Sequence, residues 1–143
     1  MKISELLKKK GNNVLTTDAD LSLRNTIKIM IEARVGSVLV VNEQKQPIGI
    51  YTERDFLKQA IECKNLDEIK VGDVMTTDLI IVTPDEDIDR ALSTMTGKRL
   101  RHLPVIENKE LIGIISIGDI VKAKLKDSQF EAKHMRDYIM GKY

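Results

Sequence analysis

The sequence of 143 residues contains no tryptophan, two phenylalanines, three tyrosines and one cysteine. A single thiol, Cys63, forms no disulfide within the chain, which fits a reducing compartment, and with no base placed near it we expect an inert thiol. Because aromatic residues are scarce, the core has to be built from Ile, Leu, Val and Met. The two histidines, His102 and His134, have no Cys or carboxylate at ligand spacing and therefore predict no metal site.

The chain also lacks long apolar runs and an excess of charge. No stretch approaches the ~20 apolar residues of a membrane span, and the first residues contain no apolar run typical of a signal peptide. The 23 basic and 22 acidic residues nearly cancel, so nothing suggests nucleic acid as a partner. The sequence therefore predicts a cytoplasmic protein, long enough for one domain with a sizeable core, with no membrane or nucleic-acid partner.

What the sequence does contain is an internal repeat. The stretch GIYTERD, from Gly49 to Asp55, recurs as GIISIGD, from Gly113 to Asp119, 113 − 49 = 64 residues later. Each copy consists of a glycine, an apolar strand end, a hydroxyl, and an aspartate three residues after that hydroxyl. The apolar positions on both sides of the two copies repeat in the same order.

Hydrophobic periodicity predicts that each repeat is a strand, a helix, two strands and a second helix. Strands are expected at residues 14–17, 38–41 and 47–51, and again at 79–82, 103–106 and 111–115. A short apolar segment opens each repeat, at residues 3–7 and again at 71–75. A unit of about 60 residues is marginal alone, so we expect an α/β (α+β) fold in which two βαββα repeats pack about a pseudo-two-fold axis.

Capping-box patterns predict where several helices begin. We expect helix starts at Thr17 and Thr83, and Ser128 is expected to begin a separate C-terminal helix with Phe130 and Tyr138 on one face. The expected division is residues 1–66 for the first repeat, 67–126 for the second, and 127–143 for the helical tail. The aromatic face of this tail either docks on the chain's own core or contacts a second copy.

The repeated motif is open to two interpretations. The glycine lets a ligand or another backbone approach closely, the free amides and dipole of a helix N-terminus suit a phosphate, and an aspartate can accept both hydroxyls of a ribose. Thr52-x-x-Asp55 and Ser116-x-x-Asp119 are also capping boxes, which are common. Both copies follow a glycine-containing strand end, where α/β units usually bind ligands, and this favours a nucleotide site.

With these features the chain resembles a known family. The pattern Gly-h-h-Thr/Ser-x-x-Asp at the end of a βαββα unit resembles a CBS domain, and two in tandem resemble a CBS pair, or Bateman module. The segments RHLPV at 101–105 and VGDVM at 71–75 resemble further parts of that family. The resemblance covers about residues 1–126. It implies a small stand-alone regulatory sensor of AMP, ADP or ATP, or alternatively of S-adenosylmethionine or NAD(H).

The resemblance also implies that each ligand site combines both repeats. The first site is expected to contain Thr52 and Asp55 with Ile80, Arg101, His102 and Pro104. The second is expected to contain Ser116 and Asp119 with Thr16, Gly36, Ser37 and Val38. Arg54 precedes Asp55, whereas Gly118 precedes Asp119. We therefore expect the second site to lack a cation and the Asp55 site to bind phosphate more tightly.

The resemblance further implies partners, because CBS pairs commonly associate two-fold into a flat disc. We expect a homodimer, an adenine nucleotide as regulatory ligand with no obligatory cofactor, and an unidentified regulated protein. No Ser-His-Asp order or Gly-x-Ser-x-Gly turn occurs, so no enzyme activity is predicted. A dimerisation module with vestigial sites stays open as an alternative, and an enzyme is the last choice. The basic run at 122–126 is interpreted as a solvated helix end.

Overall fold

The structure is a computed structural model of the chain, and it describes residues 1–62 and 65–141. Within its last helix it does not describe the side chains of Phe130, Glu131, His134, Met135 and Tyr138. Cys63 and the predicted aromatic face of the tail therefore lie outside the described part. None of the helices described is long and apolar enough to cross a membrane.

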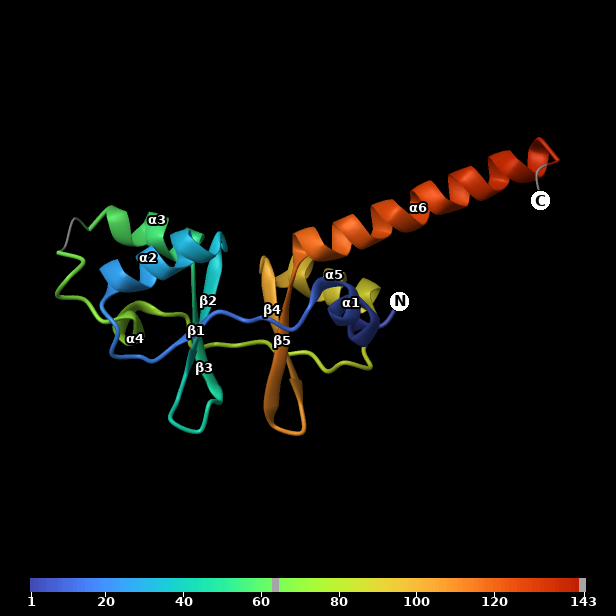
Figure 1. Cartoon of the computed structure of the whole chain (residues 1–143). Helices are drawn as coiled ribbons and strands as arrows, with labels where there is room; N and C mark the ends of the chain where they lie inside the picture. The colour runs from blue at the N-terminus through green and yellow to red at the C-terminus, as the bar shows by residue number, and fades with distance from the viewer. Residues whose placement is uncertain (63–64, 142–143) are drawn as a thin grey trace.

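Two lobes lie side by side, and each contains its own sheet (Figure 1). Lobe one contains β1 (Thr16–Thr17), α2 (Leu23–Ala33), β2 (Ser37–Val41), β3 (Pro47–Thr52) and α3 (Glu53–Ala60). Lobe two contains α5 (Ile88–Lys98), β4 (His102–Glu107), β5 (Glu110–Ser116) and the long helix α6 (Ile117–Ile139). Two further helices, α1 (Ile3–Lys10) and α4 (Val71–Val74), open the two repeats. The mixed α/β fold with two repeats and a C-terminal helix is confirmed.

The two sheets differ in one strand. In lobe one β1 runs parallel to β2, and β2 pairs antiparallel with β3. In lobe two β4 and β5 form an antiparallel pair, and the strand expected at 79–82 is reduced to a single parallel bridge between Val82 and Val105. The remaining expected strands form within one or two residues of their predicted ends.

The opening helices are exchanged between the lobes. On α1, Ile3, Leu6 and Leu7 are buried in the core of lobe two, whereas Val71 on α4 is buried in the core of lobe one. Matching backbone hydrogen bonds fix both helices: the Ile3 amide donates to the Glu86 carbonyl at 2.9 Å, and the Val71 amide donates to the Leu21 carbonyl at 2.9 Å. Each lobe therefore depends for its core on a segment from the other half of the sequence.

The glycine of each motif copy makes room for this exchanged segment. A β-carbon on Gly113 would lie 2.8 Å from Cδ2 of Leu7, and one on Gly49 would overlap the thioether of Met75. Both neighbours belong to the segments that cross between the lobes. The close approach anticipated from the sequence is thus made by a side chain of the protein rather than by a ligand.

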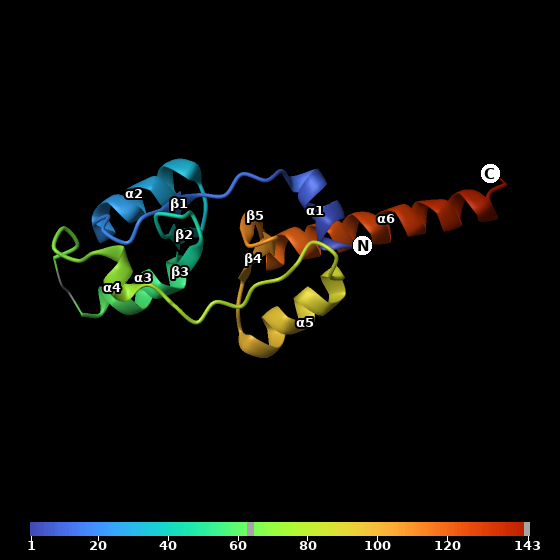
Figure 2. The same ribbon diagram turned by 90° about the horizontal axis from the view of Figure 1, so that it is seen from below.

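Three of the predicted helix starts are wrong. Ser22 caps α2 and Asp87 caps α5, because Leu21 and Glu86, just before them, accept backbone hydrogen bonds from the exchanged segments. The Thr83 amide does donate to Glu86 Oε2 at 2.7 Å, as in a capping box, but this contact closes a turn. Ser128 lies inside α6, since no glycine or proline between residues 119 and 140 ends that helix. The outer part of α6 projects away from lobe two (Figures 1 and 2).

Candidate functional site

The first motif copy caps α3 where β3 ends. The Thr52 amide donates to Asp55 Oδ2 at 3.0 Å, and the Asp55 amide donates to Thr52 Oγ1 at 3.3 Å. The other carboxylate oxygen of Asp55 accepts a long hydrogen bond, 3.4 Å, from the Thr76 hydroxyl. Gly36, which follows α2, also helps to cap α3: its carbonyl accepts a hydrogen bond from the Glu53 amide at 3.0 Å. The capping-box interpretation of this motif is therefore correct.

The second copy repeats this arrangement at the start of α6. The Ser116 amide donates to Asp119 Oδ2 at 2.8 Å, and the Asp119 amide donates to Ser116 Oγ at 3.1 Å. The Ile117 amide donates to the Arg101 carbonyl at 2.9 Å. Three amides at this helix N-terminus are therefore already bonded within the protein. That cap amides receive a phosphate stays a prediction.

A lysine from the exchanged helix α1 contacts the second motif. Lys10 Nζ lies 2.6 Å from Asp119 Oδ2 and also donates to the Ile114 carbonyl at 2.6 Å. Burial opposes ionisation of Asp119, but hydrogen bonds from Lys10 and from the Ser116 amide outweigh it, so its pKa lies below the usual value. The expectation that this site lacks a cation is wrong, because Lys10 provides one from a part of the chain far away in sequence.

A cavity of about 310 Å³ lies beside this ion pair and is lined by both repeats. The first repeat contributes Lys10, Asn13, Val14, Leu15, Arg34, Val35, Gly36 and Ser37. The second repeat contributes His102, Ile114, Ser116 and Asp119. Its wall combines apolar side chains with hydroxyls, a carboxylate and basic groups. Such a cavity between two structural units is a usual position for a small ligand.

Four of the residues predicted for the second site meet in this cavity: Gly36, Ser37, Ser116 and Asp119. The other two lie outside its lining, since Val38 is buried in the core of lobe one and Thr16 is exposed on β1. Their neighbours Val14 and Leu15 take that part of the wall. The crossed combination of the two repeats is thus present in the geometry of the second site.

His102, predicted for the first site, also lines this cavity. The β4–β5 pairing places His102 opposite Ser116, which explains its position. Burial, and then the positive charge of Lys10, lower the pKa of His102 below its usual value. The side chain is therefore neutral at pH 7 and can both donate and accept a hydrogen bond inside the cavity.

The other residues predicted for the first site lie outside the cavity that joins the repeats. Arg54 and Arg101 are exposed, and Ile80 is partly buried against the core of lobe two. Pro104 is buried in β4, where its carbonyl accepts the Val82 amide at 3.0 Å. Thr52 and Asp55 contact each other, and neither lines the cavity that contains Asp119.

Sequence reasoning missed Lys10 and Arg34, both of which line the cavity. Lys10 belongs to a basic run that ends a short helix, a common arrangement with no functional signal of its own. Only the exchange of α1 onto lobe two brings it to Asp119. One signal in the sequence could have pointed to Lys10. The segment between the opening helix and the first strand is longer in the first repeat than in the second.

Paired βαββα lobes with exchanged opening segments and a shared cavity define a tandem CBS pair. The CBS domain family matches residues 3–62 and 71–126, so the chain belongs to this family. It is 39% identical over 150 residues to the CBS domain-containing protein CBSX3, mitochondrial, of Arabidopsis thaliana, covering 99% of this chain and 73% of that protein. Two further relatives are longer, and the chain spans 50% and 43% of their length.

Solved structures show the same architecture. The CBS-domain protein ATU1752 from Agrobacterium tumefaciens is 34% identical, with a TM-score of 0.83 over 87% of this chain and 99% of that one. The CBS domain pair of MJ0100, solved in complex with 5′-methylthioadenosine and S-adenosyl-L-methionine, shares the fold with a TM-score of 0.79 at 20% identity. It covers 89% of this chain and 98% of its own.

Proposed function

We propose that the protein is a non-catalytic regulatory module that binds an adenosine ligand in the cavity between its two repeats. One observation carries the proposal: the second copy of the repeated motif and the α2–β2 link of the other repeat line one cavity together. The MJ0100 CBS pair was solved with two adenosine compounds, which supports the same ligand class here. AMP, ADP and ATP are the leading candidates, with S-adenosylmethionine and NAD(H) as alternatives.

The groups around the cavity match the parts of an adenosine. The Asp119 carboxylate can accept hydrogen bonds from the ribose hydroxyls, since carboxylates bind vicinal diols with two oxygens. Val14, Leu15 and Ile114 provide apolar surface for the base, and neutral His102 offers it a donor and an acceptor. We therefore place the principal ligand at Asp119, while the tighter phosphate binding predicted for Asp55 stays a prediction.

The exchange of α1 gives the ligand a way to affect the shape of the molecule. Residues 11–15 connect α1, packed in lobe two, to β1 of lobe one, and Asn13, Val14 and Leu15 of this connection line the cavity. A ligand in the cavity contacts the connection and both lobes at once. Occupancy then changes the relation of the lobes if two arrangements bind the ligand with different affinity.

The test is a thermal-shift panel with AMP, ADP, ATP, S-adenosylmethionine and NADH on the full chain. Binding at a hundredfold excess over Kd adds about 2.7 kcal/mol of apparent stability. Asp119→Ala is expected to abolish the shift, whereas Asp55→Ala is expected to leave most of it. No shift with any compound refutes the proposal, and a shift lost only in Asp55→Ala moves the principal site to the first motif.

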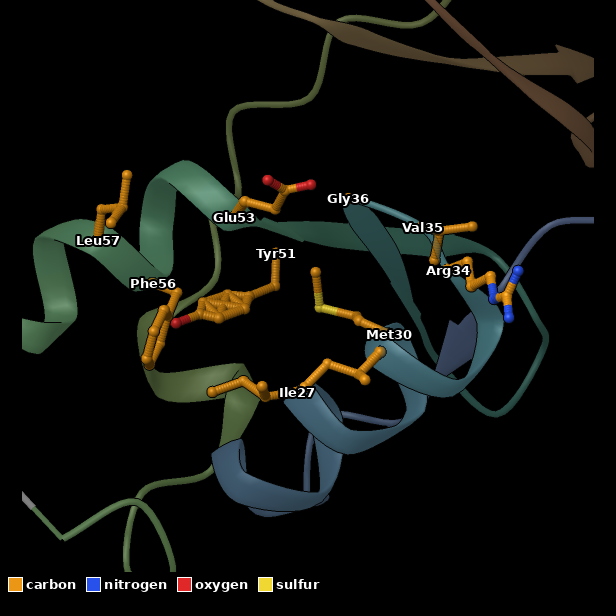
Figure 3. Close-up of a pocket in the computed structure, with 10 residues that line it drawn as sticks. Ile27, Met30, Arg34, Val35, Gly36, Tyr51, Glu53, Phe56 and Leu57 are labelled. Atoms are coloured by element: carbon orange, nitrogen blue, oxygen red, sulfur yellow. The ribbon is translucent and has the colours of Figure 1, made fainter.

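A second candidate, an interaction module, is favoured by an apolar groove in lobe one. Figure 3 shows this cavity of about 530 Å³ between α2 and α3, with the Tyr51 ring between the two helices. Ile31 is 70% exposed on one side and Leu57 is 68% exposed on the other. Exposed apolar surface of this kind marks an interaction site, which supports the predicted homodimer and a regulated protein partner.

Sedimentation separates the two functions. Leu57→Glu is expected to convert a dimer to monomer, while Ile81→Glu, at an exposed apolar position outside the groove, is the control. Unchanged mass for Leu57→Glu contradicts a dimer through this groove.

The cytoplasmic location stays a prediction, because the mitochondrial designation of CBSX3 describes that protein. Fractionation of the source cells tests it.

A further inference from the structure

A second, strongly basic cavity adjoins the Asp119 site. It has a volume of about 260 Å³ and lies between α1 and α6, lined by Leu6, Lys9, Lys10, Asp119, Lys122, Ala123 and Lys126. Four of these seven residues are lysines, and one is acidic. Lys10 and Asp119 are the two residues that line this cavity and the cavity between the repeats. The ion pair between them therefore lies where the two spaces meet.

The lysines converge because of helix geometry. Asp119, Lys122 and Lys126 lie at positions i, i+3 and i+7 of α6 and therefore share one face, which α1 covers. Lys124 lies on a different face and pairs with Asp89 of α5. The basic run interpreted from the sequence as a solvated helix end is thus divided, with two of its lysines in the cavity and one in a structural ion pair.

Charge in this cavity is unbalanced. Among the ion pairs in the described part of the chain, Lys10–Asp119 is the pair whose residues line this cavity. Four ammonium groups against one carboxylate leave an excess of three positive charges around a small volume. Like charges held close together repel, and a bound anion of several charges relieves this repulsion. Lysine ammonium groups are frequent phosphate ligands.

Three amides of the α6 N-terminus, those of Ser116, Ile117 and Asp119, donate within the protein and are therefore not free for a phosphate. Phosphate oxygens on a ligand whose ribose lies at Asp119 need other donors. Lysine donors lie in the second cavity, which shares Lys10 and Asp119 with the first. This weakens the usual anion site at a helix N-terminus and favours the lysine cavity for the phosphate chain.

Resting on the adenosine-binding function above, we propose that this lysine cavity is the polyphosphate subsite of the Asp119 site. The ribose lies on Asp119, and the phosphate chain passes Lys10 into the cavity formed with Lys9, Lys122 and Lys126. Lys10 changes partner from the Asp119 carboxylate to a phosphate when the ribose hydroxyls take its place. The site then selects ATP or ADP over AMP, and it disfavours S-adenosylmethionine, whose sulfonium carries a positive charge.

The experiment is isothermal titration calorimetry of the full chain with ATP, AMP, S-adenosylmethionine and inorganic tripolyphosphate at constant ionic strength. The variants are Lys122→Met/Lys126→Met, with Lys124→Met as the matched control on another face of the same helix. Each lost charge-assisted contact is expected to lower ATP affinity about tenfold. AMP affinity is expected to change less than threefold, and Lys124→Met is expected to leave both unchanged.

The outcomes separate this inference from the proposed function. If no nucleotide binds the wild-type chain, the adenosine-binding function itself fails. If AMP binds in an Asp119-dependent way but ATP and AMP respond equally to Lys122→Met/Lys126→Met, the polyphosphate subsite alone is refuted. Tripolyphosphate that binds Asp119→Ala as tightly as ATP binds the wild-type chain also refutes it, because the cavity is then a separate anion site.

Discussion

Asp55 and Asp119 occupy the same position in the two motif copies, yet their surroundings differ in charge. Both accept an amide hydrogen bond from the hydroxyl residue that caps their helix, at 3.0 Å in the first copy and 2.8 Å in the second. Asp55 then meets the neutral Thr76 hydroxyl, whereas Asp119 meets the Lys10 ammonium. The motif itself therefore builds the cap, and the exchanged segment decides which groups reach the aspartate.

The difference arises from the length of the exchanged helices. The helix α4 (Val71–Val74) has 4 residues, and the backbone becomes extended at Met75 with φ −64° and ψ 157°. The helix α1 (Ile3–Lys10) has 8 residues, and its additional turn brings Lys10 to Asp119. Two sites with the same motif thus acquire different chemistry through the longer opening helix of the first repeat.

The largest effect is expected from the exchanged helices themselves. Ile3 and Val71 are both 0% exposed, each in the core of the opposite lobe. Ile3→Ala is expected to lower the free energy of unfolding by about 2–5 kcal/mol, and Val71→Ala by somewhat less because valine is smaller. Native-state hydrogen exchange is expected to locate the loss in lobe two for Ile3→Ala and in lobe one for Val71→Ala.

A loss of protection in lobe one for Ile3→Ala, or in lobe two for Val71→Ala, contradicts the exchange of the opening helices between the lobes. Leu57→Ala serves as the control, since Leu57 is 68% exposed and its truncation leaves both cores intact. Its expected effect on protection within either core is small, so it shows whether the two lobes respond separately.

The motif glycines are expected to give an intermediate effect. A methyl group at Gly113 enters the space of Leu7, so Gly113→Ala is expected to cost about 1–3 kcal/mol of stability, measured by urea denaturation. Gly49→Ala is expected to cost less, since the thioether of Met75 can move aside more easily.

Gly118→Ala is the control for the motif glycines. Gly118 lies in α6, and a β-carbon added to it would lie 3.6 Å from Ser116 Oγ, an ordinary contact distance. This substitution is expected to be neutral or to stabilise the chain by up to about 1 kcal/mol, because alanine is the better helix former. Equal losses at Gly113 and Gly118 contradict a packing role for the motif glycine.

The order of strands and helices could be predicted from the sequence because both copies carry the same apolar pattern. The helix starts at Thr17 and Thr83 could not be placed, since the residues after them pair with segments from the other half of the chain. Local capping signals do not report such pairing. The continuous α6 was missed for a related reason. A cap pattern such as that at Ser128 begins a new helix only where the preceding helix ends, and no glycine or proline ends it there.

For the candidate site, Gly36, Ser37, Ser116 and Asp119 followed from the family resemblance and meet in one cavity. Lys10 did not follow, because its role depends on a helix that packs on the lobe of the other repeat. The ranking of the two sites by Arg54 stays a prediction, although Arg54 is exposed, whereas Lys10, far away in sequence, contacts Asp119.

The Lys10–Asp119 ion pair predicts a pH dependence of stability. The pKa of Asp119 in the folded chain is lowered, so its contribution is present above the pKa of the unfolded state, about 3.9, and is lost as the pH falls through the folded-state pKa. Asp119→Asn is expected to cost about 1 kcal/mol at pH 7 and progressively less below about pH 4. Urea denaturation from pH 7 to pH 3 measures this, and a constant difference over that range contradicts an ionised, paired Asp119.

The smallest effect is expected from a substitution at the buried position two residues after the motif glycine, where the two lobes carry different residues. Tyr51 in lobe one corresponds to Ile115 in lobe two, and both are 0% exposed. Burial, followed by the charge of Asp55, raises the pKa of Tyr51 to about 12, and its hydroxyl has no hydrogen-bond partner in the described part of the chain. Tyr51→Phe is expected to be neutral or to stabilise the protein by up to about 1 kcal/mol. A loss of stability in Tyr51→Phe contradicts a buried hydroxyl without a hydrogen-bond partner.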